Sequence, residues 1–146
     1  MKYIALVLFI ALFTSCKPKH TSNDLGNFIH STLKKNNGTL DLRPYKNNNW
    51  NRLYILEPYI NKTQFDATLQ NYEQEIVQTG IEGLDDRFVL LLLNNDQLID
   101  VSIIKRSIDF SDALKYNGSK IGFYTKNNCI FHYKKEDEDW FKIGMP

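Results

Sequence analysis

The sequence predicts an α+β domain with an antiparallel sheet of about six strands and two main helices, in the order α-β-β-α-β-β-β-β, with the helices on one face. Three observations predict it. Apolar residues recur at helical spacing in two segments, an apolar run at 88–93 has the length of a strand, and short β-like segments follow it. The chain has 146 residues, enough for one ordinary domain, which we place at residues 24–146.

The first helix is expected to begin near Asn23 and Asp24, since either residue caps a helix N-terminus well. Its apolar stripe is formed by Leu25, Phe28, Ile29 and Leu33. Gly38 then supplies a left-handed residue that ends the helix. Residues 39–43 alternate in polarity and residues 50–57 are rich in aromatic and aliphatic side chains, so both segments are predicted to be strands.

The second helix has the clearest predicted start in the chain. Asn61 is a good cap, and Gln64, three residues later, is placed to reach back to it as in a capping box. Helical spacing then continues through Phe65, Leu69, Tyr72 and Ile76. Residues 88–93 are apolar on both faces, which predicts a central strand with another layer packed on each side.

The C-terminal third is predicted to be mainly β. Residues 98–105 form the partner strand of 88–93, and residues 109–115 form a short helix or an irregular turn. Residues 121–125 and 129–133 are expected to form a hairpin, because Asn tolerates the positive φ angles of a type I′ turn. This register places Cys129, Phe131 and Tyr133 on the face of Tyr124. Residues 140–143 are predicted to be a last edge strand.

The N-terminus has the pattern of a secretory signal peptide. A start with one positive charge is followed by an apolar run from Ile4 to Phe13 and then by small residues. A membrane-spanning helix needs about 20 apolar residues, and this run is much shorter. The sequence therefore predicts a cleaved signal at residues 1–15 and a polar tether at 16–23.

The segment Phe13-Thr14-Ser15-Cys16 resembles the lipobox of bacterial lipoproteins, with Phe13 where that pattern usually has Leu. The resemblance implies that Cys16 becomes the first residue of the mature protein and carries acyl chains. Lipid on Cys16 would anchor the domain to the bacterial cell membrane or outer membrane, on the periplasmic or extracellular side. Ordinary secretion, with Cys16 unmodified, is the alternative.

Composition and motifs argue against several classes of function. The formal net charge of +1 provides no basic field for nucleic acid. His20, His30 and His132 lack ligand spacing, so no metal or cofactor is expected. Cys129 is interpreted as a small buried residue. The acidic pairs Asp85-Asp86, Glu73 with Glu75, and Asp109 with Asp112 are interpreted as solvated or capping groups rather than as catalytic acids.

The segment at residues 50–59 resembles a W-x-x-L-Y-x-x-x-P-Y stretch of small uncharacterised bacterial secreted proteins and lipoproteins, a resemblance that implies no activity. Its aromatic residues are either core residues or an exposed binding patch, since aromatic side chains with a polar tip are enriched at interfaces. Such a patch would consist of Tyr45, Trp50, Tyr54 and Tyr59.

Three functions remain open from the sequence. The first is a non-enzymatic binding or accessory lipoprotein of the cell envelope, with an unknown protein partner. The second is an immunity or inhibitor protein that neutralises a toxin acting in the envelope. The third is a hydrolase with an atypical site, which the acidic pairs would have to supply. We expect the first, because the chain combines an anchor with no recognisable catalytic motif.

Overall fold

Eight strands form two four-stranded sheets in the computed structural model, which describes residues 22–35, 37–115 and 118–146. The strands are β1 (Thr39–Asp41), β2 (Arg52–Leu56), β3 (Arg87–Asn94), β4 (Gln97–Lys105), β5 (Ile108–Asp109), β6 (Ile121–Thr125), β7 (Ile130–Asp137) and β8 (Trp140–Gly144). The α-helices are α2 (Asp24–Leu33), α3 (Ala67–Gln70), α4 (Glu73–Val77) and α5 (Ser111–Lys115), and the 3-10 turns are η1 (Tyr45–Asn48), η2 (Lys62–Gln64) and η3 (Lys126–Asn128). The predicted α+β class is confirmed. The predicted signal peptide, Cys16 and most of the tether lie outside the described residues.

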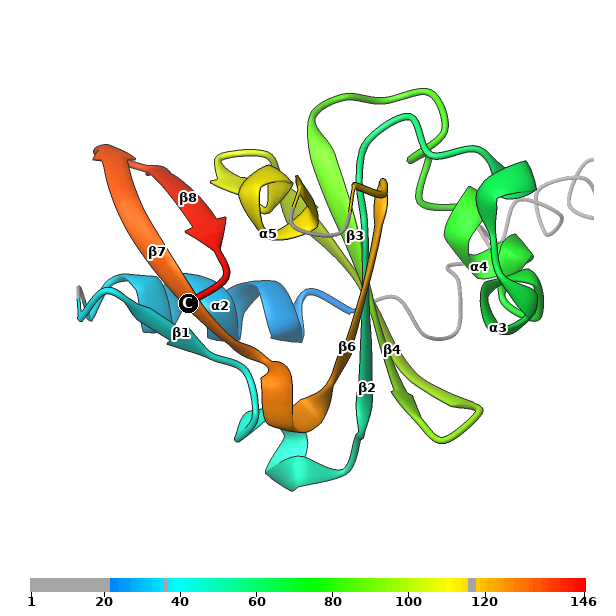
Figure 1. The fold of residues 1–146 in the computed structure, drawn as a ribbon, viewed down its shortest axis with the longest axis horizontal. Coiled ribbons are helices and arrows are strands. Elements are labelled where there is room, and N and C mark those ends of the chain that lie inside the picture. The colour runs from blue at the N-terminus through cyan, green and yellow to red at the C-terminus, as the bar shows by residue number, and fades with distance from the viewer. Residues whose placement is uncertain (1–21, 36, 116–117) are drawn as a thin grey trace, which may run out of the picture.

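The strands expected in one sheet are divided between two. The central sheet has the order β4-β3-β2-β6 and is antiparallel throughout. The second sheet has the order β1-β7-β8-β5, with β5 and β8 parallel. Figure 1 shows the second sheet on one side of the central sheet and helices α3 and α4 on the other. The expectation that helices lie on one face is therefore wrong, because α2 packs on the side of the second sheet.

Strand β3 is the central strand that its sequence predicts. It pairs with β2 on one side and β4 on the other. Its side chains alternate between two cores: Phe88, Leu90 and Leu92 face the second sheet, and Val89, Leu91 and Leu93 face α3 and α4. An apolar residue is required at every position because each face of the strand is covered.

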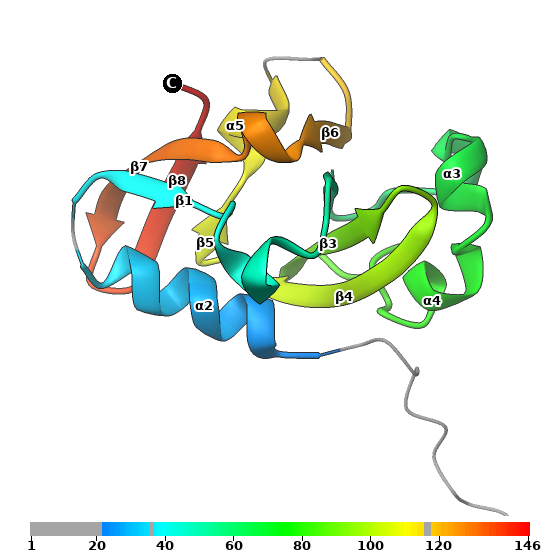
Figure 2. The ribbon, with the colours of Figure 1, turned by 90° about the horizontal axis from the view of Figure 1, so that it is seen from below.

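Helix α2 connects the two sheets along one side of the molecule. Figure 2 shows it reaching from β4 of the central sheet to β1 of the second sheet. Leu25, Ile29 and Leu33 are fully buried, as the predicted stripe requires. The predicted cap is not formed by Asn23, whose side chain makes no capping hydrogen bond. Instead the Ser22 hydroxyl accepts a 3.3 Å hydrogen bond from the amide of Asp24.

The second predicted helix is divided into three short pieces. Its capping box forms as expected: Asn61 Oδ1 accepts from the Thr63 amide at 3.0 Å, and Gln64 Oε1 accepts from the Asn61 amide at 3.1 Å. The backbone then becomes extended at Phe65, and Asp66 caps a new helix by accepting from the Leu69 amide at 2.8 Å. The competing cap at Asp66 restarts the helix and breaks its continuity.

The predicted hairpin between 121–125 and 129–133 does not form. Strand β6 pairs with β2 in the central sheet, whereas β7 pairs with β1 and β8 in the second sheet. Residues Lys126–Asn128 form a 3-10 turn that carries the chain from one sheet to the other. The predicted facing is nevertheless confirmed, since Tyr124 and the three residues Cys129, Phe131 and Tyr133 share the core between the sheets.

The last strand is not an edge strand. The C-terminal strand β8 lies between β7 and the two-residue strand β5, which pairs with it in parallel. The short strand β5 gave no β pattern of its own, because two residues are too few to show alternation.

Candidate functional site

The four aromatic residues of the predicted binding patch do not lie together. Tyr45 and Trp50 are buried in the core between the two sheets, where the Trp50 indole donates a 3.0 Å hydrogen bond to the Tyr45 carbonyl. Tyr54 is buried in the other core, on the opposite face of the central sheet. Only Tyr59 among the four is exposed, at 52%. Three of the predicted patch residues are therefore core residues, and the four do not form one interface.

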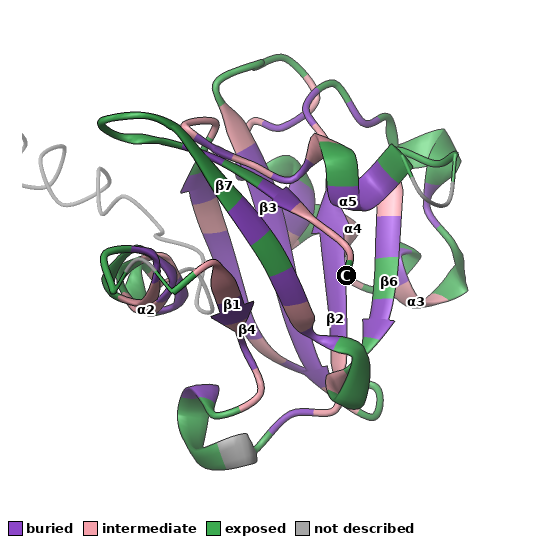
Figure 3. Cartoon of the chain, turned by 60° about the vertical axis from the view of Figure 1, so that its left-hand side comes forward, coloured by how far each residue is buried: buried purple, intermediate pink, exposed green. Residues whose placement is uncertain are grey.

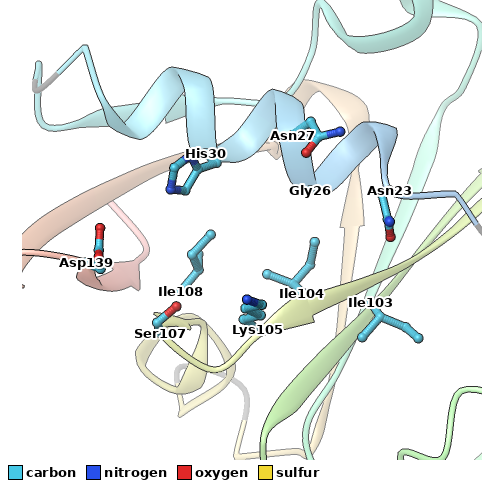
Figure 4. Close-up of a pocket in the computed structure, with 10 residues that line it drawn as sticks. All are labelled: Asn23, Gly26, Asn27, His30, Ile103, Ile104, Lys105, Ser107, Ile108 and Asp139. Atoms are coloured by element: carbon cyan, nitrogen blue, oxygen red, sulfur yellow. The ribbon is translucent and has the colours of Figure 1, made fainter.

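The structure has a groove of about 620 Å³ between α2 and the corner where β4 leads into β5. Figure 4 shows Asn27 and His30 projecting from α2 and Asn23 directly before it, with Lys105, Ser107 and Asp139 along the other margin. The apolar part of its lining consists of Gly26, Ile103, Ile104 and Ile108. A Cβ at Gly26 would lie 3.5 Å from the Ile104 side chain, which is an ordinary van der Waals contact.

The polar side chains that line this groove do not form a catalytic pair or a metal site in the described part of the chain. The Ser107 hydroxyl and the His30 imidazole make no hydrogen bond to another residue in the described part of the chain, so no base is positioned to activate the serine. Residues 22–35, 37–115 and 118–146 also contain no group of three or more His, Cys, Asp or Glu side chains arranged to hold a metal ion. The polar groups are therefore available as hydrogen-bonding contacts around an apolar floor.

One acid of each pair singled out in the sequence forms an ion pair at the surface, Glu73 with Lys62, Asp86 with Arg87 and Asp112 with Lys115. Asp86 pairs with Arg87 at 2.6 Å, and Asp112 pairs with Lys115 at 2.8 Å. Each basic partner lowers the pKa of its aspartate. Asp109 accepts from the Ser111 amide at 2.9 Å, which is the capping role expected for it. A general acid needs a raised pKa, so Asp86 and Asp112 are shifted in the opposite direction.

Cys129 is fully buried in the core between the sheets and forms no disulfide. Burial, together with the nearby charge of Asp41, raises the pKa of its thiol to about 12. The thiol is therefore protonated at neutral pH, and only a thiolate is an effective nucleophile. The interpretation of Cys129 as a small buried residue is confirmed.

A buried carboxylate on β4, a strand that also lines the groove, is the most distinctive polar feature of the structure. Asp100, on β4, has an exposed fraction of 1%. It accepts hydrogen bonds from the Ser22 hydroxyl at 2.9 and 3.1 Å and from the Tyr45 hydroxyl at 2.9 Å, and the Lys46 ammonium lies 3.6 Å away. A buried charge is tolerated only when it is paired and hydrogen-bonded in this way.

The Asp100 cluster also controls the state of Tyr45. Burial of the phenol, reinforced by its hydrogen bond to Asp100 and by the charge of that carboxylate, raises the pKa of Tyr45 above its ordinary value of 10. The phenol therefore remains a donor at physiological pH. Lys46 has a positive φ of 47°, which is uncommon for a residue with a side chain, and its ammonium is directed to the same carboxylate.

Ser22 fixes the start of the described chain to the edge of the central sheet. Its amide donates to the Val101 carbonyl at 3.2 Å, and its carbonyl accepts from the Ser102 hydroxyl at 3.2 Å. With the two bonds to Asp100, both the backbone and the side chain of Ser22 are held. The chain therefore enters the domain at a defined position on β4, directly beside the groove that Asn23 helps to line.

The sequence reasoning missed Asp100 and the groove. Asp100 is the single acid within the predicted strand at 98–105, and it shares a face with Ser102 and Ile104. A lone acid within a strand that is otherwise mostly apolar was the available signal that it would be buried and paired.

The comparisons with known proteins returned no relatives. No protein-family model matches the chain, and neither the curated proteins nor the solved structures include a match to it. Among the residues that the structure describes, no helix has the length and apolar character needed to cross a membrane. The functional argument therefore depends on the sequence pattern and on the geometry given above.

Proposed function

We propose that the chain is a lipid-anchored protein of the bacterial cell envelope whose residues 24–146 form a non-catalytic binding or accessory domain. The anchor is proposed at Cys16 on the strength of the lipobox-like segment that ends there. The observation that carries the proposal furthest is the attachment of Ser22 to β4 and Asp100. A lipid at Cys16 would be connected to Ser22, a fixed point of the domain, by a short segment of the chain.

The length of this connection limits how far the domain extends from the membrane. Ser22 lies six positions after Cys16, and a fully extended chain covers about 20 Å in six steps. The side of the domain that carries Ser22, the N-terminus of α2 and the groove would therefore be held close to the bilayer.

Lipid on Cys16 would make the attachment stable. Each buried methylene contributes about 0.8 kcal/mol, so a single acyl chain binds reversibly and two or more bind durably. A non-catalytic role is supported by the protonated, buried Cys129 thiol and by the surface pairing of Asp86 and Asp112.

Metabolic labelling with an alkyne-bearing palmitate tests the anchor. We expect label in the wild-type protein and in the matched control Cys129→Ala, both in the membrane fraction. Cys16→Ser should lose the label and leave the membrane fraction. Label that persists in Cys16→Ser, or an unmodified mature N-terminus found by mass spectrometry of the wild-type protein, would contradict the proposal.

A further inference from the structure

Strand β6 forms an open edge of the central sheet. The strand order β4-β3-β2-β6 gives it β2 as a neighbour on one side only, and Figure 3 shows it at the margin of the sheet. The other edge differs, because Ser22 bonds to the Val101 carbonyl of β4 and α2 packs beside that strand. An unpaired edge strand presents a row of backbone donors and acceptors on which another extended chain can pair.

The register shows which backbone groups point outward. The amide of Lys126 donates to the Asn51 carbonyl, and the amide of Glu57 donates to the Lys120 carbonyl, both at 2.9 Å. Since hydrogen-bonded pairs alternate in an antiparallel ladder, Gly122 and Tyr124 also bond toward β2. The backbone groups of the intervening residues, Ile121, Phe123 and Thr125, therefore face away from the sheet.

Most of these outward groups are unoccupied. The Ile121 amide donates to the Ser119 hydroxyl at 3.1 Å, and the Thr125 carbonyl accepts from the Cys129 thiol at 3.3 Å. Within the described part of the chain, the amide and carbonyl of Phe123 and the amide of Thr125 make no hydrogen bond. A strand added here would pair with the middle of β6.

The side chains of β6 provide an apolar contact on one face. Phe123 is 47% exposed, although it is a large aromatic residue in a strand. Its ring lies 5.1 Å from the ring of Tyr54, centroid to centroid. The Tyr54 hydroxyl in turn donates a 3.0 Å hydrogen bond to Asp66, which holds the Tyr54 ring in place. The pair therefore forms a firm aromatic platform for a side chain opposite Phe123.

The charged residues at the two ends of β6 indicate which kind of strand can pair with its open edge. Lys120 precedes the strand and Lys126 follows it, with the Lys126 ammonium over the Trp50 ring at 5.5 Å. A shallow pocket lies at each end, one of about 280 Å³ lined in part by Lys120 and Glu57, the other of about 400 Å³ lined in part by Lys126 and Arg52. These ends favour carboxylates on an added strand.

A second copy of the chain fits this edge poorly. Antiparallel pairing of two β6 strands about Phe123 would place Lys120 of one copy opposite Lys126 of the other, at both ends of the interface. Like charges directly opposite each other are destabilising. A segment with acidic residues at those positions would replace both repulsive pairs of lysines by attractive pairs of opposite charge.

We propose that the open edge of β6 is a docking site for an extended acidic segment of a partner protein. The segment adds to the central sheet as a fifth strand, with an apolar residue opposite Phe123 and carboxylates near Lys120 and Lys126. These two lysines are six positions apart, which corresponds to about 20 Å along a strand. The inference rests on the proposed role as a binding domain but not on the lipid anchor.

The test measures binding of short fluorescent peptides to the full-length chain purified in detergent. The acidic probe is Glu-Thr-Ser-Val-Ser-Thr-Glu with blocked ends, and the basic probe replaces each Glu by Lys. Two cross-strand charge pairs change sign between the probes, so we expect the acidic probe to bind about tenfold more tightly. Binding should slow hydrogen exchange at the amides of Phe123 and Thr125.

Proline at Thr125 is the decisive variant. Thr125 has φ −76°, which proline adopts without strain, and its outward amide has no role in the pairing with β2. We expect Thr125→Pro to fold and to lose binding of the acidic probe, while the matched control Thr125→Val, which keeps the amide, retains it. Lys120→Glu reverses the charge at one end of β6. It should abolish the preference for the acidic probe over the basic probe.

Three outcomes of the binding measurements would overturn the proposal. They are equal binding of the two probes, binding unchanged in Thr125→Pro, and absence of binding by the acidic probe. Sedimentation that shows a dimer lost in Thr125→Pro would assign the edge to a second copy and would also overturn it. Palmitate labelling reports the anchor separately, so failure of the anchor and failure of the docking site are distinguishable.

Discussion

The hydroxyl of Tyr45 donates a 2.9 Å hydrogen bond to Asp100 Oδ2, although the two residues are 55 positions apart in the sequence. This bond connects η1 to β4. Together with the bonds from Ser22, it neutralises the cost of a carboxylate buried at the edge of the central sheet. The cluster therefore links the point where the chain enters the domain to the core between the sheets.

Tyr45→Phe should destabilise the domain by about 1–3 kcal/mol, because it leaves a buried acceptor without one of its donors. Chemical denaturation measures the change in the free energy of unfolding. Tyr59→Phe is the matched control: its side chain is largely exposed, so its effect should stay within about 0.5 kcal/mol. Equal effects of the two substitutions would show that the bond to Asp100 contributes nothing.

Stability should fall as the pH rises above 10, the ordinary pKa of tyrosine. The pKa of Tyr45 is raised in the folded state by burial and by Asp100, so the unfolded chain loses this proton first. The stabilising contribution is complete below pH 10 and is lost progressively above it, as the linkage relation requires. Denaturation of wild type and Tyr45→Phe between pH 8 and 11 measures the effect, and the stability difference between them should narrow at the alkaline end.

Cys129 should resist thiol reagents in the folded protein. Its pKa of about 12 and its complete burial leave no accessible thiolate at pH 8. Labelling with iodoacetamide, followed by mass spectrometry, should show no modification until denaturant unfolds the chain. Cys129→Ala supplies the background signal. Rapid labelling of the native protein would mean that this part of the core opens readily.

Leu91→Ala should lower the free energy of unfolding by about 2–5 kcal/mol, since it creates a cavity in a strand covered on both faces. Leu91 belongs to β3, and its side chain is fully buried against the layer formed by α3 and α4. Leu84→Ala is the control with the same chemistry, because Leu84 is 41% exposed. Its effect should stay within about 0.5 kcal/mol. Similar losses for both variants would contradict the assignment of Leu91 to this core.

Several features were determined by the sequence alone because they depend on short-range signals. The alternation of β3 between two cores follows from an unbroken apolar run, and the stripe of α2 follows from helical spacing. The capping box of Asn61 and Gln64 forms from residues three positions apart. Each of these signals is complete within one segment, so no distant partner changes it.

The tertiary structure decided which strands pair and which polar groups are buried. Residues 121–125 and 129–133 have a turn between them that suits a hairpin, but burial against β2 and β1 places β6 and β7 in different sheets. The same division separates Tyr54 from Tyr45 and Trp50 and leaves the edge of β6 open. Which strands pair depends on how the whole chain packs its side chains. The residues of a turn do not determine this by themselves.

Asp100 shows the limit of sequence reasoning most clearly. Its position within a strand was predictable, but its burial requires Ser22 and Tyr45, which lie 78 and 55 positions away. The sequence by itself therefore determined the fold class and a lipobox-like N-terminus. Only the folded chain brought Ser22 to β4, because long-range donors stabilise a buried carboxylate and local sequence does not specify them.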